Sequence, residues 1–351
     1  MSAFPPQSLL SLYSRLARPW VQRAERRRHL QALRVATERL VDQITPELRS
    51  LPAYQARLAP VVERIREHSI TLVDKIPGPV PIDKERWSND PLVNALFEEP
   101  TALSGAVSAP AVQKWLQDHP EDSAGELYGL LIAKPKERSQ LGSEMRGDRL
   151  ERDVKQKTLR FTEHEIAAVD SDPDRLRLAL ARPVADLIQS LGIGRLTAQE
   201  ERIVAHEETL RVLRLKLKVI TPRVDGVDLL LGTRAENTAE LQRLQSKIAE
   251  TERALVMARR GLNGIEQYFE RITELLGYPG EAVQLEPMCV WLDRMNVVRD
   301  RDHPRAREVT LMRAMSRGKP GRVVLFVRFP RALVAGGNDG TEAPEPPRDD
   351  G

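Results

Sequence analysis

The stretch from Leu241 to Leu276, LQRLQSKIAETERALVMARRGLNGIEQYFERITELL, places apolar or small residues alternately three and four positions apart. This spacing continues for about five heptads, which is the pattern of a helix in a coiled coil. The stripe is narrower than the apolar face of an ordinary globular helix. Its positions are Leu241, Leu244, Ile248, Thr251, Leu255, Ala258, Leu262, Ile265, Phe269, Ile272 and Leu276. The sequence therefore predicts a long helix that needs another helix against it.

Two glycines, Gly261 and Gly264, fall inside this stripe without changing its phase. Together they cost a helix about 2 kcal/mol relative to alanine. Because the apolar spacing continues from Ala258 through Leu262 to Ile265, we expect the helix to run through RRGLNG. A bend or the close approach of another backbone would explain the glycines.

A second stripe with the same spacing precedes the first. Its positions are Leu196, Gln199, Ile203, His206, Leu210, Leu213, Leu217 and Ile220. The pattern breaks at Pro222 and Gly226, which together with Asp225 make a turn sequence. We expect the two helices to fold back on each other there as an antiparallel hairpin, with a single kinked rod as the alternative.

The N-terminal region has helical spacing of apolar residues over 20–42 and again after Pro52. The proline-rich stretch from Ile76 to Pro91 predicts an extended crossing without helix. Short helices are expected at PLVNALF, with Asp90 as the N-cap and Pro91 in the first turn, and at PAVQKWLQ.

Strand-like segments lie on both sides of the heptad region. ELYGLLIAKP, which could also be a helix, and ERDVKQKTLRF are expected to pair. A helix follows over 172–194, kinked at Pro183 and ending at its glycines. After YPGE, MCVWLDRMNVV, REVTLMRAMS and RVVLFVRF are expected strands, with SRGKPG as a hairpin turn.

These elements predict an α+β protein, mainly α. It has a helical N-terminal region and a long antiparallel coiled-coil hairpin projecting from a small antiparallel β head. Two separate parts of the chain form this β head. The expected segments are a helical pair (1–75), a proline-rich crossing with short helices (76–124), the first β part and a helix (125–195), the coiled-coil hairpin (196–277), the second β part (278–334) and a disordered acidic tail (335–351).

Composition excludes some classes of protein. The 351 residues include 54 basic and 51 acidic side chains, for a net charge of +3, so attraction of the whole molecule to nucleic acid or anionic lipid is weak. One cysteine, Cys289, excludes an intramolecular disulfide and fits a reducing, cytoplasmic setting. No apolar run reaches the length of a transmembrane span. The arginine-rich N-terminus predicts a helix at a domain edge, with a transit peptide or a membrane-surface helix as alternatives.

Catalytic and metal motifs are incomplete. His164 and His206 each begin the zinc-protease pattern HExxH, but Ala168 and Leu210 stand where the second histidine belongs. We therefore expect His164 on the surface after a strand and His206 in the coiled-coil seam. DSDPD lacks the glycine and glutamate of a calcium loop and is typical of a helix N-terminus. With Cys289 expected to be a core thiol, no cofactor, metal site or catalytic residue is predicted.

Charge is concentrated near the C-terminus, where the segment from Asp293 to Arg331 holds eleven cations and four acids. A cationic β-hairpin can follow a phosphate backbone or enter a nucleic-acid groove. The candidate contacts are Arg313, Arg317, Lys319 and Arg322. The nearby Phe326, Phe329 and Trp291 stand in apolar runs and indicate core packing rather than base stacking.

The function expected from this sequence is that of a non-enzymatic intracellular scaffold or protein-interaction protein. Its heptad helices would bind a protein partner or a second copy of the chain. The residues expected to form that seam are Leu241, Leu244, Ile248, Leu255, Leu262, Ile265 and Phe269. Two alternatives stay open, namely a nucleic-acid-associated protein that uses the C-terminal hairpin and an enzyme without a recognisable motif.

Overall fold

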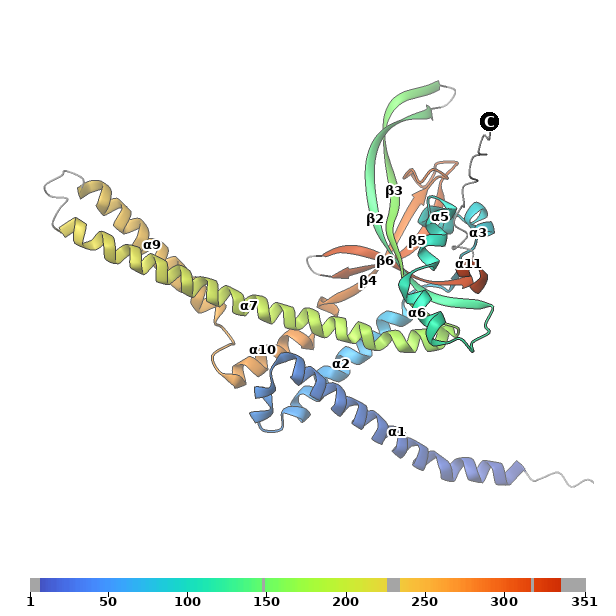
Figure 1. Cartoon of the computed structure of the whole chain (residues 1–351), viewed down its shortest axis with the longest axis horizontal. Helices are drawn as coiled ribbons and strands as arrows, with labels where there is room; N and C mark the ends of the chain where they lie inside the picture. Colours follow the sequence, from blue (N-terminus) through green and yellow to red (C-terminus); the bar gives the residue numbers. More distant parts are fainter. Residues whose placement is uncertain (1–6, 147–148, 226–233, 317–318, 336–351) are drawn as a thin grey trace, which may run out of the picture. The chain divides into compact units, whose positions relative to one another are not determined.

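A computed structural model describes residues 7–146, 149–225, 234–316 and 319–335, and side chains over 26–142, 152–220, 238–316 and 320–334 (Figure 1). The chain divides into two compact units, and each unit is built from two separate segments. Unit 1 comprises Met1–Arg66 and Asp186–Pro279, and unit 2 comprises Glu67–Ala185 and Gly280–Gly351. The expectation that the β head comes from two separate parts of the chain is therefore confirmed.

Helices supply unit 1. The helices with residues in this unit are α1 (Gln7–Ile44), a 3-10 helix (Pro46–Ser50), α2 (Tyr54–Asp74), α7 (Pro173–Asp225), α9 (Arg234–Ala258) and α10 (Ile265–Gly277), and both α2 and α7 also contribute residues to unit 2. The predicted N-terminal helices form, and Leu40 and Val41 of α1 and Leu58 and Ile65 of α2 are fully buried.

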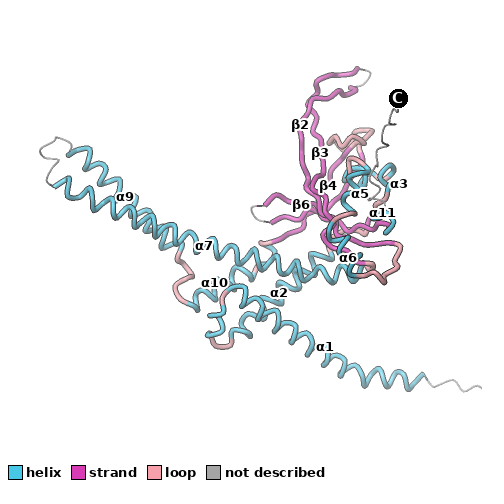
Figure 2. Tube along the Cα trace, viewed as in Figure 1, coloured by secondary structure: helices cyan, strands magenta, loops and turns pink. Residues whose placement is uncertain are grey.

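Helices α7 and α9 run antiparallel beside each other (Figures 1 and 2). Three contacts join α7 to α9 and to Arg259, the residue that follows α9. Gln199 donates a hydrogen bond to the Ala258 carbonyl at 2.8 Å. Glu207 pairs with Arg259 at 2.5 Å, and Arg214 pairs with Glu252 at 2.8 Å. From the Glu207 pair to the Arg214 pair, the residue number rises along α7 while that of the partner falls from 259 to 252, so the predicted fold-back is confirmed and the kinked rod is wrong.

Helix α7 is one helix of 53 residues. The predicted end at Gly192 and Gly194 and the predicted break at Pro222 are therefore wrong. A Cβ atom at Gly192 would lie 2.3 Å from Leu276 Cδ2, so this glycine permits close packing of α10 rather than ending the helix. Pro222 lies within the last turn of α7, which continues to Asp225.

The predicted passage of a helix through RRGLNG is also wrong. Helix α9 ends at Ala258 and α10 begins at Ile265, with Gly264 as its N-cap. Gly261 has φ 79° and Gly264 has φ 108°, values that side chains with a Cβ rarely adopt. Leu262, inside the interruption, and Ile265, the first residue of α10, are both half-buried, so the apolar phase continues across it.

Unit 2 contains a six-stranded sheet with strand order β3-β2-β6-β5-β4 and a short β1 on β6. The strands are β1 (Val80–Pro81), β2 (Glu126–Arg146), β3 (Arg149–Asp170), β4 (Val283–Leu292), β5 (Arg307–Ser316) and β6 (Lys319–Pro330). Neighbours are antiparallel except β1 and β6, which are parallel. Both strand regions predicted from the sequence meet in this sheet, since β2 pairs with β6 from Glu126 to Ala133.

The loop after β4 connects the two edge strands of this path. Val298 donates its backbone N–H to the Lys157 carbonyl in β3 at 2.8 Å. Arg299 donates to the Trp291 carbonyl in β4, also at 2.8 Å. The loop is thus held by backbone hydrogen bonds from both sides.

Short helices accompany the sheet. They are α3 (Lys84–Asn89), α4 (Pro91–Leu96), α5 (Pro100–Val107), α6 (Pro110–Asp118) and α11 (Arg331–Ala335), and a second 3-10 helix spans Pro279–Glu281. Asp90 caps α4 by accepting a hydrogen bond from Leu92 N at 2.8 Å, as predicted. The prediction that 76–91 has no helix is wrong, because α3 starts after the prolines and Asp83 caps it through Arg86 N at 2.7 Å.

The core of unit 2 joins the sheet to these helices. Phe97, Leu103 and Val112 from the helices and Leu127, Phe161 and Phe329 from the strands are all at most 1% exposed. The fold class α+β, mainly α, is confirmed, with N-terminal helices, the long helix α7 and a mostly antiparallel sheet.

Candidate functional site

The predicted seam is the covered face of α9. Leu241, Leu244 and Ile248 are half-buried and Leu255 is 9% exposed, whereas most residues between these positions are exposed. The facing stripe of α7 behaves in the same way, with Leu210 and Leu213 buried. Heptad spacing on both helices therefore describes the packing of one helix against the other within this chain.

The last seam residue, Phe269, has a different neighbour. It lies in α10 and is 2% exposed, with the guanidinium of Arg57 from α2 4.2 Å from its ring centroid. Arg57 also pairs with Glu266 at 2.5 Å. The interruption after α9 thus turns the end of the stripe toward the N-terminal helices. This contact joins residues more than 200 positions apart and has no signal in the sequence.

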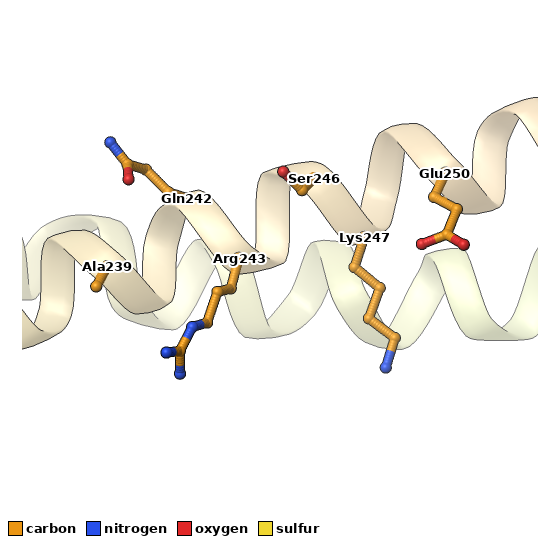
Figure 3. Close-up of a pocket in the computed structure, with 6 residues that line it drawn as sticks. All are labelled: Ala239, Gln242, Arg243, Ser246, Lys247 and Glu250. Atoms are coloured by element: carbon orange, nitrogen blue, oxygen red, sulfur yellow. The ribbon is translucent and has the colours of Figure 1, made fainter.

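A shallow hollow of about 430 Å³ lies along α9. Figure 3 shows its lining residues, Ala239, Gln242, Arg243, Ser246, Lys247 and Glu250, all on this one helix. The side chains are exposed, and Gln242 and Arg243 point in opposite directions (Figure 3). Because the polar groups do not converge on a point, this hollow has no geometry for fixing a small ligand.

Helix α7 carries a second apolar stripe on the face opposite its seam. At 100° per residue, residues 204, 212, 215 and 219 lie on the side of the helix turned away from Leu210 and Leu213. Their side chains are exposed, at 64% for Val204, 42% for Val212, 56% for Leu215 and 59% for Val219. We call these four residues the outer stripe. In the sequence this stripe is masked by the stronger periodicity of the seam on the other face of α7.

Two of the four predicted nucleic-acid contacts, Arg313 and Arg322, pair with neighbouring acids. Arg322 pairs with Glu163 of β3 at 2.8 Å. Arg313 approaches Glu286 of β4 at 3.9 Å, and its Nε is buried. Of the other two predicted contacts, Arg317 lies outside the described residues, and Lys319 begins β6 with a side chain that is not described. Phe326 and Phe329 are buried, as expected for core residues.

His164 does not follow a strand on the surface, as predicted, but lies within β3, half-buried. Its Nε2 donates to the Leu96 carbonyl at 2.7 Å, and its ring stands 4.9 Å from that of Phe97. Burial lowers the pKa of His164, against the opposing effect of the hydrogen bond to Leu96. These contacts give the imidazole a packing role between β3 and α4.

Cys289 is exposed, so its prediction as a core thiol is wrong. Residues alternate between the faces of β4, and it is Met288 and Val290 that pack toward the core. The thiol donates to Glu308 Oε1 at 3.0 Å, and this hydrogen bond raises the pKa of Cys289. A raised pKa disfavours the thiolate that a nucleophile or metal ligand needs.

Across the part of the chain that the structure describes, no cluster of three histidine, cysteine or acidic side chains is arranged to hold a metal ion. Among the described helices, none has a stretch long and apolar enough to cross a membrane. Comparison with protein families, with characterised proteins and with solved structures finds no match for this chain.

Proposed function

We propose that this protein is a non-enzymatic scaffold that assembles through its coiled-coil hairpin, α7 with α9, and that a second copy of the chain covers the outer stripe. The single observation that carries the proposal is the pair of apolar stripes on opposite faces of α7. One stripe packs on α9, and the other is exposed. A helix that is polar outside needs no further partner, whereas an exposed apolar row is typical of an interaction surface.

Glu208 lies on the same face between Val204 and Val212, where it pairs with Arg211 at 3.8 Å, and the charges of this face favour a second copy. Consider two α7 helices, one from each copy, packed antiparallel with Val212 at the centre. Val212 of one copy then meets Val212 of the other. Val204 of one copy lies within one residue of the level of Val219 of the other. Glu208 then lies at the level of Lys216, a pair of opposite charge, and both side chains are exposed. This pair would make the twofold arrangement complementary in charge at two symmetric positions.

The seam residues have a supporting part in this proposal. Leu255 and its neighbours pack α9 against α7, the helix that carries the outer stripe. A scaffold made this way depends on both stripes, but only the outer stripe touches the partner.

The experiment is light scattering coupled to size-exclusion chromatography on the full chain. The double substitution Leu215→Asp and Val219→Asp is expected to convert a dimer to a monomer. Leu141→Asp in β2 is the matched control, since Leu141 is also exposed, at 68%, and lies far from α7 in the sequence. A dimer that persists in the Leu215→Asp, Val219→Asp protein contradicts the proposal.

The nucleic-acid alternative has less support. Arg322 is paired with Glu163, so a phosphate would have to displace a carboxylate that already satisfies this guanidinium. We therefore favour the scaffold function.

A further inference from the structure

The basic segment from Asp293 to Arg331 divides into engaged and available cations. Six are engaged within the described residues. Arg299, Arg313, Arg322 and Arg328 pair with carboxylates, Arg331 donates to the Asp122 carbonyl, and Arg301 lies 5.7 Å from the ring centroid of Trp291. Arg294, Arg305 and Arg307 pair with no carboxylate of the described residues.

These three arginines gather at two hollows of unit 2 that share part of their walls. A hollow of about 250 Å³ is lined by Trp87, Ser88, Asn89, Asp90, Pro91, Asn94, Arg294 and Arg307. A second, of about 480 Å³, is lined by Asp293, Arg294, Met295, Pro304, Arg305, Ala306 and Arg307. Arg294 and Arg307 therefore stand between the two spaces and can reach a ligand in either.

The loop that carries Arg294 is fixed before any ligand arrives. Asp293 accepts hydrogen bonds from Met295 N at 2.8 Å and Val297 N at 3.0 Å, and it pairs with Arg299 at 2.9 Å. Asn296, buried with φ 57°, donates to the Ala95 carbonyl at 3.3 Å. A preorganised loop loses little conformational entropy when a ligand binds.

The two acids in the lining are already satisfied. Asp293 accepts the hydrogen bonds from Met295 N and Val297 N and pairs with Arg299. Asp90 accepts a hydrogen bond from Leu92 N of the helix that it caps. Both acids therefore have partners of their own, whereas none of the three arginines forms an ion pair with a carboxylate of the described residues. The electrostatic balance of the site therefore favours an anion.

We propose that Arg294, Arg305 and Arg307 bind the phosphates of a nucleoside phosphate. Guanidinium groups recognise phosphate oxygens with two parallel hydrogen bonds, which suits a site with three arginines. The smaller hollow adds the indole of Trp87, held by its hydrogen bond to the Phe97 carbonyl at 2.7 Å, beside the polar side chains of Asn89 and Asn94. An aromatic ring next to amide groups is suited to a base. This inference is independent of the scaffold function.

The test is isothermal titration calorimetry of the full chain with ATP and with inorganic pyrophosphate. Both probes are expected to bind, and ATP more tightly because the base adds contacts. Arg294→Ser and Arg307→Ser should each weaken ATP binding at least tenfold, which corresponds to about 1.4 kcal/mol. Arg322→Ser is the matched control, because this arginine of the same basic segment lines neither hollow and pairs with Glu163, and it should leave binding unchanged.

Three results would overturn the proposal. The first is no heat of binding from either probe at millimolar concentration. The second is equal weakening by Arg322→Ser, which would mean diffuse attraction to positive charge. The third is binding of a duplex DNA oligonucleotide that ATP does not displace, which would assign the arginines to a nucleic-acid backbone. Circular dichroism of each variant tests whether the chain stays folded after an exposed arginine is replaced.

Discussion

Two glycines in α7, two residues apart, are expected to respond oppositely to the same substitution. In a helix interior, alanine is favoured over glycine by about 1 kcal/mol. Gly194 has no atom within 4 Å of the position that a Cβ would take, so Gly194→Ala should stabilise the chain by about that amount. At Gly192 the same methyl group would lie 2.3 Å from Leu276 Cδ2.

The magnitude at Gly192 follows from this contact. Leu276 is 2% exposed, so its side chain has little room to move away. Forcing an additional methyl group into a packed site costs about 1–3 kcal/mol, which offsets or exceeds the helix-propensity gain. Gly192→Ala should therefore be neutral to destabilising by about 2 kcal/mol, and the gap between the two variants should be about 1–3 kcal/mol.

Urea unfolding followed by far-ultraviolet circular dichroism measures both free energies. In a Leu276→Ala background the clash is removed, and Gly192→Ala should then stabilise the chain as Gly194→Ala does. A loss of stability in Gly194→Ala would show that α7 ends at its glycines in a left-handed conformation. Equal gains from the two glycine variants in the wild-type background would refute the contact with Leu276.

Other predictions address the seam, the buried histidine and the basic hairpin. Leu255→Ala, at a 9% exposed position, should cost about 2–3 kcal/mol of unfolding free energy, whereas Val256→Ala, at a 70% exposed position, should change it by less than about 0.5 kcal/mol, as measured by urea unfolding. Because burial lowers the pKa of His164, its neutral form is favoured in the folded chain, and stability should fall as the pH drops below the unfolded value of about 6.5. An NMR titration that puts the His164 pKa at or above 6.5 would contradict this. If the C-terminal hairpin does not bind nucleic acid, Ser substitutions at Arg317, Lys319 and Arg322 should leave retention of the protein on a heparin column unchanged. A clear loss of retention would support nucleic-acid binding by this hairpin.

The sequence predicts the fold best where one local rule decides. Heptad spacing identifies the facing surfaces of α7 and α9, since only those positions are covered when two helices pack. Asp90 followed by Pro91 marks the start of α4 because a side-chain acceptor and a fixed φ both suit a first turn. These features need no knowledge of distant residues.

Predictions from the sequence failed where contacts with distant residues or the backbone conformation determine the structure. Strand β2 continues past the predicted end at Pro135 to Arg146, although this extension has few residues of high β-propensity, and β3 continues past the predicted end at Phe161 to Asp170, which pairs with Tyr128. Cys289 stands in an apolar run but on the outward phase of its strand. Gly264 caps α10 within an unbroken apolar phase, so spacing alone does not show the end of α9.

The candidate sites were harder to predict than the fold. The arginine-rich segment was visible in the sequence, but which arginines are paired depends on Glu163 and Glu126, which lie more than 150 residues away. The outer stripe is readable in the sequence at helical spacing, yet its importance comes from the exposure of all four residues.

The most direct test of the account is the mass of the full chain in solution, measured by light scattering across a range of concentrations. The account predicts a dimer that Leu215→Asp with Val219→Asp converts to a monomer while Leu141→Asp does not. A wild-type chain that stays monomeric at the highest concentrations, with its helices intact, would contradict it.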